Sequence, residues 1–184
     1  AVFLARESEA FPYHYELPLL KGQPAPPADP RIAHIFNIRQ DELGTPLETL
    51  AVAYPRWRDA VLNDPLLSDN AEDLIQSVQR EMHLVYTENQ LTNDIITPRD
   101  YRLRLPCEVR IYELTGLKPA NSRYFGLAEL REARPSGWTE IPYQHLPAHT
   151  TMQKRLVERV RMLYFAEDLQ SALPFGELNR LGLP

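Results

Sequence analysis

The stretch from residue 29 to residue 54 constrains the fold most, because its side chains alternate along two runs that a short polar loop separates. The first run places Ile32, His34, Phe36 and Ile38 on one side and Ala33, Ile35, Asn37 and Arg39 on the other, and the second contains Leu47, Leu50, Ala51, Val52 and Tyr54. A period of two is typical of β-strands, and at about 3.3 Å per residue each run would span roughly 25 Å. Because both faces carry apolar groups, the pattern predicts a long β-hairpin, better suited to a large wall than to a compact binding domain.

The composition indicates a folded chain without nucleic-acid binding or direct membrane insertion. Of the 184 residues, 43% are hydrophobic and 24% are charged, which is typical of one globular domain or one segment of a larger protein. The net charge is -5 and the basic residues are spread among acids, whereas nucleic-acid binding needs Lys and Arg gathered on one face. No run approaches the roughly 20 apolar residues of a membrane span, and the N-terminus lacks the order of a signal peptide.

The first 28 residues are predicted to hold strands and a proline-rich loop. Residues 2–5 have strand character, and because the chain begins inside this run and stops without a cap or tail, we interpret it as a fragment. Aromatic residues alternate with prolines and polar residues over 11–17, which predicts a strand at a sheet edge, since proline cannot donate a ladder hydrogen bond. Residues 21–28 would form a semi-rigid loop, and residues 44–46 would close the hairpin turn.

Residues 55–79 are predicted to form an irregular segment and then a helix. The irregular part contains Trp57 and the turn Asn63-Asp64-Pro65. Asp69 or Asn70 would cap a short helix ending at Gln79, because a short polar side chain can accept from the free N–H groups of the first turn.

Residues 79–115 are predicted to form two further strands. Apolar and polar residues alternate from Arg80 into a polar run at 87–90, which predicts the third strand of the chain. Residues 101–115 predict a fourth strand, kinked at Pro106 and followed by a glycine that ends it.

Two later segments have helical spacing. Residues 126–133 predict a short helix, with Leu127 and Leu130 three apart. Over residues 151–165 two periods compete: Leu156, Val157, Val160, Leu163 and Tyr164 fit a helical face, while Leu156, Val160, Met162 and Tyr164 share a strand parity. Periodicity alone favours a helix there. The predicted fold class is mainly β, with long antiparallel strands and one or two short helices, and α+β as the alternative.

The sequence lacks the common motifs for nucleotide binding, hydrolysis and metal binding. No two glycines stand two apart, so G-x-G-x-x-G fails, and neither G-x-x-x-x-G-K-[ST] nor G-x-S-x-G occurs. His145 and His149 are four apart, but Pro147 lies between them and no Glu follows His145, which favours two loop histidines over a metal site. Cys107 is the one cysteine, so the chain can build neither an internal disulfide nor a cysteine-based zinc site.

The remaining reactive residues are better explained by packing than by catalysis. His14, His34 and His83 each lie in an alternating strand, where a lone histidine is more often packed or half-exposed than a base. Cys107 is flanked by Leu105 and Val109 and is expected to behave as a small hydrophobe. The Glu7-Ser8-Glu9 run matches the Glu-x-Glu pair of ADP-ribosyltransferases but lacks their Ser-Thr-Ser element.

Two groups of side chains could contact a ligand. The aromatic set is Phe11, Tyr13, Tyr15, Tyr54, Tyr86, Tyr112 and Trp138. It could line a carbohydrate site, although sheet packing explains it as well. Arg155, Arg159 and Arg161, with Glu158 among them, could grip an acidic partner, although a solvated face is the more common explanation. We therefore assign no catalytic, cofactor-binding or metal-binding residue, and we expect no cofactor.

Seven runs, in order along nearly the whole chain, together carry a family resemblance. They are Phe-Pro-Tyr-His-Tyr-Glu at 11–16, Asp-Pro-Arg-Ile-Ala-His at 29–34, Ala-Val-Ala-Tyr-Pro-Arg at 51–56, Tyr-Thr-Glu-Asn at 86–89, Tyr-Arg-Leu-Arg-Leu-Pro-Cys-Glu-Val-Arg-Ile-Tyr-Glu-Leu-Thr-Gly at 101–116, Arg-Leu-Val-Glu-Arg-Val-Arg-Met-Leu-Tyr at 155–164 and Leu-Pro-Phe-Gly-Glu-Leu at 173–178. The series resembles the B component of the bacterial Tc insecticidal toxin complexes, the TcdB/TcaC-like proteins, whose conserved part is shared with the SpvB virulence protein.

The resemblance implies a middle region of that subunit, after its β-propeller and before its RHS repeats. In this family the B and C components form a hollow, strand-built cocoon around the cytotoxic tail of the C component, and the propeller docks on the pore-forming A component. The implied role is a non-catalytic wall segment of a secreted toxin that is delivered to host cells. Its partners would be the rest of the B subunit and the C subunit, with the A subunit contacted by regions outside this chain. The resemblance also implies a strand over residues 152–164, and no catalytic residue of the family maps to this sequence.

Two hypotheses follow. In the first, residues 1–184 are a single segment of a toxin-encapsulating β-shell, with the hairpin at 29–54, strands at 79–115, a short helix at 126–133 and strands at 151–184 leading into the shell. It predicts long antiparallel strands with unpaired edges. In the second, the chain is a small-molecule or carbohydrate-binding module, or an enzyme domain, that uses the aromatic strand at 11–17. It predicts a deep pocket with convergent polar groups.

Overall fold

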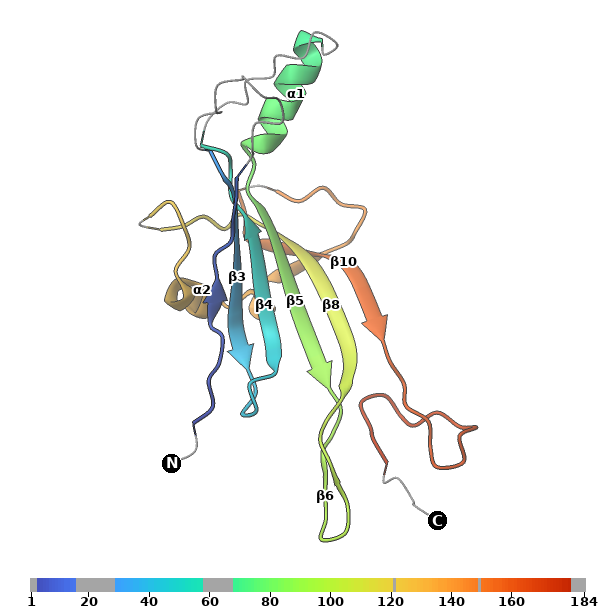
Figure 1. The fold of residues 1–184 in the computed structure, drawn as a ribbon. Helices are drawn as coiled ribbons and strands as arrows, with labels where there is room; N and C mark the ends of the chain where they lie inside the picture. Colours follow the sequence, from blue (N-terminus) through green and yellow to red (C-terminus); the bar gives the residue numbers. More distant parts are fainter. Residues whose placement is uncertain (1–2, 16–28, 58–67, 121, 149, 180–184) are drawn as a thin grey trace, which may run out of the picture.

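The structure, a computed structural model, describes residues 3–15, 29–57, 68–120, 122–148 and 150–179. These residues are 39% strand and 14% helix, which confirms the mainly β fold class. An eight-stranded sheet forms the body of the molecule, in the order β1-β3-β4-β5-β8-β10-β9 with β2 also on β3 (Figure 1). Leu17, the loop predicted at 21–28 and the turn predicted at 63–65 lie outside the described residues.

Five long strands form the centre of the sheet, and each is antiparallel to its neighbours among them. They are β3 (Arg31–Gln40), β4 (Pro46–Ala53), β5 (His83–Leu91), β8 (Pro106–Thr115) and β10 (Gln153–Arg161). The first two form the long hairpin that the alternation predicts, with Phe36 opposite Leu50. The third predicted strand is β5, which includes the polar run at 87–90.

The hairpin turn is built by an aspartate and a glycine. Asp41 Oδ1 accepts hydrogen bonds from the backbone N–H groups of Leu43, at 2.9 Å, and Thr45, at 2.8 Å. Gly44 has a φ of 88°, in the left-handed region that favours glycine. Together these residues fix the loop length and therefore the register of β3 on β4.

Short strands form both borders of the sheet. β1 (Glu9–Ala10) and β2 (Tyr13–His14) pair with β3 at one border, which confirms the predicted edge position of the aromatic run. The run is interrupted at Phe11-Pro12, where the proline lacks an N–H, so it is shorter than the strand predicted at 11–17. At the other border, β9 (Thr139–Ile141) pairs in parallel with the start of β10.

The strand predicted at residues 2–5 is wrong for its described part. Residues 3–5 lie outside every strand, and the Phe3 side chain is 91% exposed. Among the described residues no strand pairs with this run, and an unpaired segment gains no ladder hydrogen bonds.

The predicted kinked fourth strand is two separate strands. β7 (Tyr101–Arg102) pairs with β6 (Ile95–Ile96) in a small ribbon, and β8 begins only at Pro106. In between, the backbone N–H of Arg104 donates to Asp94 Oδ1 at 2.7 Å and that of Leu105 donates to Thr92 Oγ1 at 2.9 Å. Side chains thus take the place of a strand ladder, which is why the strand breaks before Pro106.

Helix α1 (Asp69–Gln79) lies beyond one end of the sheet (Figure 1) and confirms the predicted helix. Its cap is Ser68, whose Oγ accepts from Ala71 N–H at 3.4 Å, and not Asp69 or Asn70 as predicted. The two acidic residues of its first turn, Asp69 and Glu72, lie at the positive end of the helix dipole.

Helix α2 (Leu127–Ala133) covers one face of the sheet and confirms the second predicted helix. Its Leu130 is fully buried in the core, and its Arg131 Nε donates to the carbonyl oxygen of Ile38 in β3 at 3.2 Å. The short helix η1 (Pro135–Gly137) follows. The core between α2 and the sheet consists of Ile32, Phe36, Ile38, Leu50, Val52, Tyr54, Leu84, Tyr86, Tyr112, Leu114, Leu117, Phe125 and Leu130.

β10 is a strand, so the helix that periodicity favours over 151–165 is wrong and the strand that the family resemblance implies is confirmed. A β-bulge at Val157 explains the misleading pattern. Leu156 pairs with Tyr112 on the covered side, but after the bulge Glu158 pairs with Ile111, so the side-chain parity shifts by one residue. The bulge brings Arg159 and Arg161 to the covered face and Val160 to the other one. Apolar residues spaced by four therefore mimic a helix.

Candidate functional site

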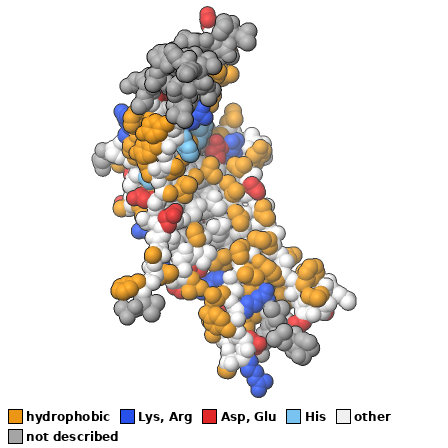
Figure 2. Space-filling model, viewed as in Figure 1, with side chains coloured by type: hydrophobic (Ala, Val, Ile, Leu, Met, Phe, Trp, Pro, Cys, Tyr) orange, Lys and Arg blue, Asp and Glu red, His pale blue; other side chains and the backbone are white. Residues whose placement is uncertain are grey.

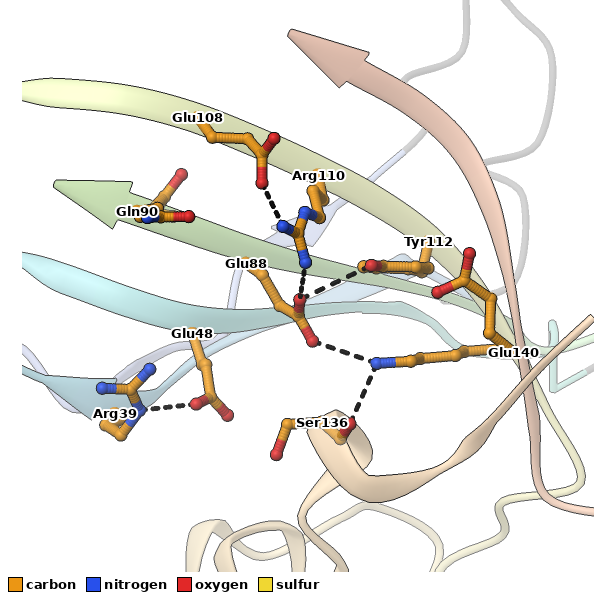
Figure 3. Close-up of a pocket in the computed structure, with 11 residues that line it drawn as sticks. Arg39, Glu48, Glu88, Gln90, Glu108, Arg110, Tyr112, Ser136 and Glu140 are labelled. Atoms are coloured by element: carbon orange, nitrogen blue, oxygen red, sulfur yellow. Dashed lines mark hydrogen bonds and ion pairs between the residues drawn. The ribbon is translucent and has the colours of Figure 1, made fainter. Parts of the chain in front are cut away.

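The covered face of the sheet changes from apolar to charged along the strands, and a hollow of about 410 Å³ lies in the charged part. Figure 3 shows its carboxylates and cations pointing toward one another from neighbouring strands. Its lining is Arg39, Glu48, Glu88, Asn89, Gln90, Glu108, Arg110, Tyr112, Ser136, Glu140 and Lys154. We call the ion-paired side chains Glu48, Glu88, Glu108, Arg39, Arg110, Lys154, Arg159 and Arg161 the charged cluster.

Glu108 is the most buried member of the charged cluster, with 1% of its surface exposed. Its Oε1 accepts from Arg159 Nε at 2.8 Å and from Arg161 Nε at 2.5 Å, and its Oε2 pairs with the Arg110 guanidinium. Burial works to raise the pKa of Glu108, but hydrogen bonds from Arg161 and Arg110 hold that pKa below its usual value. Glu108 is therefore ionised, and its ion pairs with Arg159 and Arg161 join β8 to β10.

Glu88 links β5 to β10 through a lysine. Lys154 Nζ donates to Glu88 Oε1 at 3.1 Å and to the Ser136 carbonyl oxygen at 3.0 Å, and it lies 4.7 Å from the centre of the Tyr112 ring. The buried ammonium thus has two oxygen acceptors and an aromatic face, which together replace its hydration. The arrangement fixes η1 against the sheet.

Glu48 lies directly opposite Glu88 in the register of β4 and β5, where two like charges would repel. Its Oε1 accepts from Arg39 Nε at 2.5 Å and its Oε2 from the Tyr86 hydroxyl at 2.8 Å. Burial first, and the hydrogen bond to Glu48 second, raise the pKa of Tyr86, so the phenol stays a donor. Each of the two opposed carboxylates therefore has its own donors, which offsets the repulsion.

The charged cluster is suited to holding strands together and not to proton transfer. Each of its three carboxylates is paired with at least one cation, so none is a free base. Among the described residues, no group of three or more His, Cys, Asp or Glu side chains could hold a metal ion. The sequence does show glutamates at inward-facing positions of three neighbouring strands, but the register that joins them is not readable from the sequence.

A second buried polar group holds β1 against β3. His34 is 5% exposed; its Nε2 lies 3.3 Å from Glu9 Oε2 and its Nδ1 lies 3.2 Å from the Tyr54 hydroxyl. The Tyr54 oxygen also accepts from Phe125 N–H at 3.0 Å, so its own proton is directed to His34 Nδ1 and the histidine donates from Nε2 to Glu9. Burial lowers the pKa of His34, and the hydrogen bond and charge of Glu9 oppose that shift.

The other face of the sheet is open. Ile35, Ala51 and Val85 lie side by side in the registers of β3, β4 and β5, and Ile35 and Val85 are 42% and 43% exposed. In Figure 1 this face is turned to the viewer and α2 lies behind the sheet. Figure 2, in the same view, shows hydrophobic side chains distributed over it around an area of pale backbone. We call the surface of Ala33, Ile35, Ala51, Ala53, Val85, Ile111 and Val160 the open face.

Comparisons with known proteins identify the family of the chain. Residues 1–105 match the family model described as the insecticide toxin TcdB middle/C-terminal region. The chain belongs to this family. Its similarity to the B component of Tc toxins, expected from the quoted runs, is thereby confirmed.

Solved structures of Tc toxins resemble parts of this TcdB segment. One is the crystal structure of TcdB2-TccC3, with 25% identity and a TM-score of 0.42 over 58% of this chain and 5% of that chain. Another is the Photorhabdus luminescens Tc holotoxin pore carrying a TccC3 mutation, with 23% identity and a TM-score of 0.46 over 69% of this chain and 6% of that chain. The TcdB segment thus spans about a twentieth of the length of these chains. The search of curated proteins found no match.

Among the described residues, His14 and His83 line one hollow of about 360 Å³, and neither His145 nor Cys107 is part of its lining. His14 and His83 are exposed on β2 and β5, and the carbonyl oxygen of His145 accepts from Arg155 Nη1 at 3.3 Å, whereas His149 lies outside the described residues. Cys107 is buried, and its Sγ lies 3.3 Å from the Gln90 carbonyl oxygen. Burial raises the pKa of Cys107, so its thiol stays protonated, as fits a small hydrophobe.

The predicted aromatic set is divided: Phe11 lies in ring contact with Tyr13 and Tyr54, with ring centres 4.9 and 6.2 Å apart, and the other members lie elsewhere. Tyr86 and Tyr112 are buried in the core, whereas Tyr15 is 62% exposed at the sheet border. Phe11 packs edge-on against His34 with ring centres 4.4 Å apart, and Trp138 Nε1 donates to the Ala133 carbonyl oxygen at 3.0 Å. The set forms no single platform on which a sugar could stack.

The predicted arginine group is divided by the bulge in β10. Arg155 pairs with Glu113 at 2.5 Å on one side, while Arg159 and Arg161 join Glu108 on the other. Glu158 is exposed. Among the described residues of the TcdB segment, no helix is both long enough and apolar enough to cross a membrane.

Proposed function

We propose that residues 1–184 act as one non-catalytic segment of a β-shell that the B component of a Tc toxin builds together with its C component. The shell would enclose the cytotoxic part of the C component for delivery into host cells. The partners of the segment would be the rest of the B component and the C component, within a secreted complex. The pore-forming A component would be contacted by other regions.

The open face is the observation that carries this proposal. One face of the sheet is packed under α2 around a core of large side chains. The other presents small and β-branched apolar residues from all five long strands, together with polar positions such as the Glu113–Arg155 ion pair. Contiguous exposed apolar surface on a folded protein usually marks an interaction site. Hollows of about 360 Å³, lined in part by Ala33 and Ala53, and about 620 Å³, lined in part by Val85, lie along this face. The apolar surface that runs across several strands suits a wall that faces an enclosed chain, which is a larger partner than a small ligand.

The charged cluster supports the same role. Its ion pairs join β3 to β4, β5 to β10 and β8 to β10 on the covered side, where pairs with buried carboxylates resist separation of the strands. A segment that must keep one face uncovered gains from cross-links on the other. The alternative, a carbohydrate-binding or enzymatic module, has less support because Tyr54, Tyr86 and Tyr112 of the aromatic set are buried and the clustered carboxylates are all paired.

Thiol labelling of the assembled toxin tests the proposal. Ala51→Cys places a thiol on the open face, and Glu132→Cys places one on the exposed surface of α2, on the opposite side of the sheet. Each variant of the full-length B component is combined with its C component and treated with a bulky maleimide. Cys107 gives little background because it is buried and protonated.

If the open face lines the enclosed space, Ala51→Cys reacts at least about tenfold more slowly than Glu132→Cys, as burial of a reactive thiol predicts. The measurement is repeated with a C component that lacks its cytotoxic part. Shielding of the Ala51→Cys thiol by the shell would persist in that complex, whereas shielding by the enclosed cytotoxic part would be lost. Equal labelling of both positions in the assembled toxin would contradict the proposed role.

A further inference from the structure

The border of the sheet along β10 is only partly occupied. β10 pairs with β8 from Gln153 to Arg161, but on its other side it pairs with β9 only from Gln153 to Arg155. Residues 157–161 are all exposed. In Figure 1 no strand lies beyond β10 along this length, so among the described residues the edge is open.

The backbone groups that face outward from this edge can be identified. Met162 N–H donates to the Cys107 carbonyl oxygen at 2.9 Å, so Met162 is directed toward β8. In an antiparallel ladder this direction alternates from residue to residue. Val160 is therefore also bonded to β8, opposite Val109, while the N–H and C=O groups of Arg159 and Arg161 point to the open side.

The side chains of the same two residues leave a surplus of positive charge at the edge. Arg159 and Arg161 share Oε1 of Glu108, and their side chains remain 39% and 52% exposed. Arg110 occupies the other carboxylate oxygen of Glu108. One buried carboxylate thus faces three guanidinium groups, and the two at the edge are incompletely neutralised.

We propose that residues 157–161 of β10 take up one further β-strand that carries acidic side chains at alternate positions and comes from another part of the toxin. Open edges with unpaired N–H and C=O groups are templates for strand addition, and the outward groups of Arg159 and Arg161 supply the hydrogen bonds. Acidic residues opposite the two arginines would complete their neutralisation. A second copy of β10 fits less well, because it would bring further arginines to the same place.

This inference rests on the proposed function only for the origin of the strand, and its test uses a separate readout. Hydrogen exchange of single backbone amides is measured in the full-length B component assembled with its C component. Val160 and Met162, which bond to β8, are internal controls for a paired strand, and Leu146, which is 91% exposed, represents a solvated loop.

A docked strand predicts that the amides of Arg159 and Arg161 exchange within about tenfold of Val160, whereas an open edge would make them about a hundredfold faster. Exchange as fast as that of Leu146 would overturn the proposal. Protection that disappears on dilution while the B and C components stay associated would also overturn it, because the occupant would then be a second copy.

Two substitutions test the acidic character of the added strand. Arg159→Gln removes one edge charge and leaves Glu108 paired with Arg110 and Arg161, and Arg159→Lys keeps the charge as the matched control. The readout is the exchange rate of the Arg161 amide relative to that of Val160, so a general loss of stability cancels. We expect Arg159→Gln to raise this ratio about two- to fivefold and Arg159→Lys to leave it unchanged, as for a partly exposed ion pair. Equal ratios in both variants would overturn the acidic partner.

The two proposals can fail separately. A reactive Ala51→Cys together with protected Arg159 and Arg161 amides would reject the lining role and keep the strand addition. A shielded Ala51→Cys with fast exchange at the edge would reject only the strand addition.

Discussion

The two faces of the same strands are built from different side chains. Neighbouring residues of β4 show this directly: Leu50 is fully buried against Tyr86, whereas Ala51, one position later, lies beside the exposed Val85 on the open face. The covered face carries the large apolar residues of the core and the charged cluster, whereas the open face carries alanines, β-branched residues and the Glu113–Arg155 ion pair. The interior of this chain therefore explains the first set, and the proposed contact with a partner would explain the apolar residues of the second.

This difference separates what stabilises the segment from what adapts it to an assembly. Substitutions on the covered face should change the free energy of unfolding of the chain itself. Substitutions on the open face should matter little until the toxin is assembled.

The largest effect is expected at the centre of the covered face. Leu50→Ala should lower the free energy of unfolding by about 3 kcal/mol, because it removes buried methyl groups and leaves a cavity beside Tyr86. Urea denaturation measures the change, and Leu50→Met, which conserves volume, should cost less than about 1.5 kcal/mol. If Leu50→Ala lowered the free energy of unfolding as little as Leu50→Met does, the site would be loosely packed.

The next largest effect is expected in the charged cluster. Glu108→Gln should lower the free energy of unfolding by about 2 kcal/mol, since it leaves Arg110, Arg159 and Arg161 without their shared carboxylate. The value lies below that for a fully buried ion pair because the arginines are in part solvated. Glu158→Gln, at an exposed position of β10, is the control and should change stability by less than about 0.5 kcal/mol. A neutral Glu108→Gln would mean that the cluster does not hold β10 to β8.

A smaller, pH-dependent effect is expected at His34. Burial lowers the pKa of His34 in the folded chain below the ordinary value of 6.5, so the unfolded chain binds the proton more readily. The contribution of the neutral His34 to the free energy of unfolding is therefore fully present above pH 6.5. It is lost as the pH falls through the pKa of His34 in the folded chain. Denaturation between about pH 7 and pH 5 should show a steeper loss of stability for the natural chain than for His34→Gln. If the free energy of unfolding fell equally steeply with pH in the natural chain and in His34→Gln, the charge of Glu9 would cancel the effect of burial on His34.

The sequence predicts the local elements well because their signals are local. The alternation around Phe36 and Leu50 gives the hairpin, and the spacing of Leu127 and Leu130 gives α2. In β10 the bulge at Val157 shifts the parity, and no local signal reports the partner strand that imposes it. Only the family resemblance indicated the strand there.

The charged cluster could not be predicted for a related reason. Glu48, Glu88 and Glu108 are 40 and 20 residues apart in the sequence, and they meet because β4, β5 and β8 are neighbours in a particular register. Glutamates at inward positions of predicted strands were the available signal. A rule that such residues need buried cations would have pointed to Arg110 and Lys154, but not to the bulge that adds Arg159 and Arg161.

The smallest effect is expected on the open face, and it tests the comparison most directly. Val85→Thr replaces a methyl group by a hydroxyl on a side chain that is 43% exposed, so the hydroxyl keeps its contact with water. The free energy of unfolding of the chain should change by less than about 0.5 kcal/mol. The matched variant Val52→Thr, on the covered face at 2% exposure, buries the hydroxyl and should lower the free energy of unfolding by about 1 to 3 kcal/mol.

In the assembled toxin, cover of the open face should make Val85→Thr destabilising as well, which thermal denaturation of the complex would detect. Equal costs of the two substitutions in the isolated chain would mean that the open face is already covered there, and the distinction between the faces would be wrong.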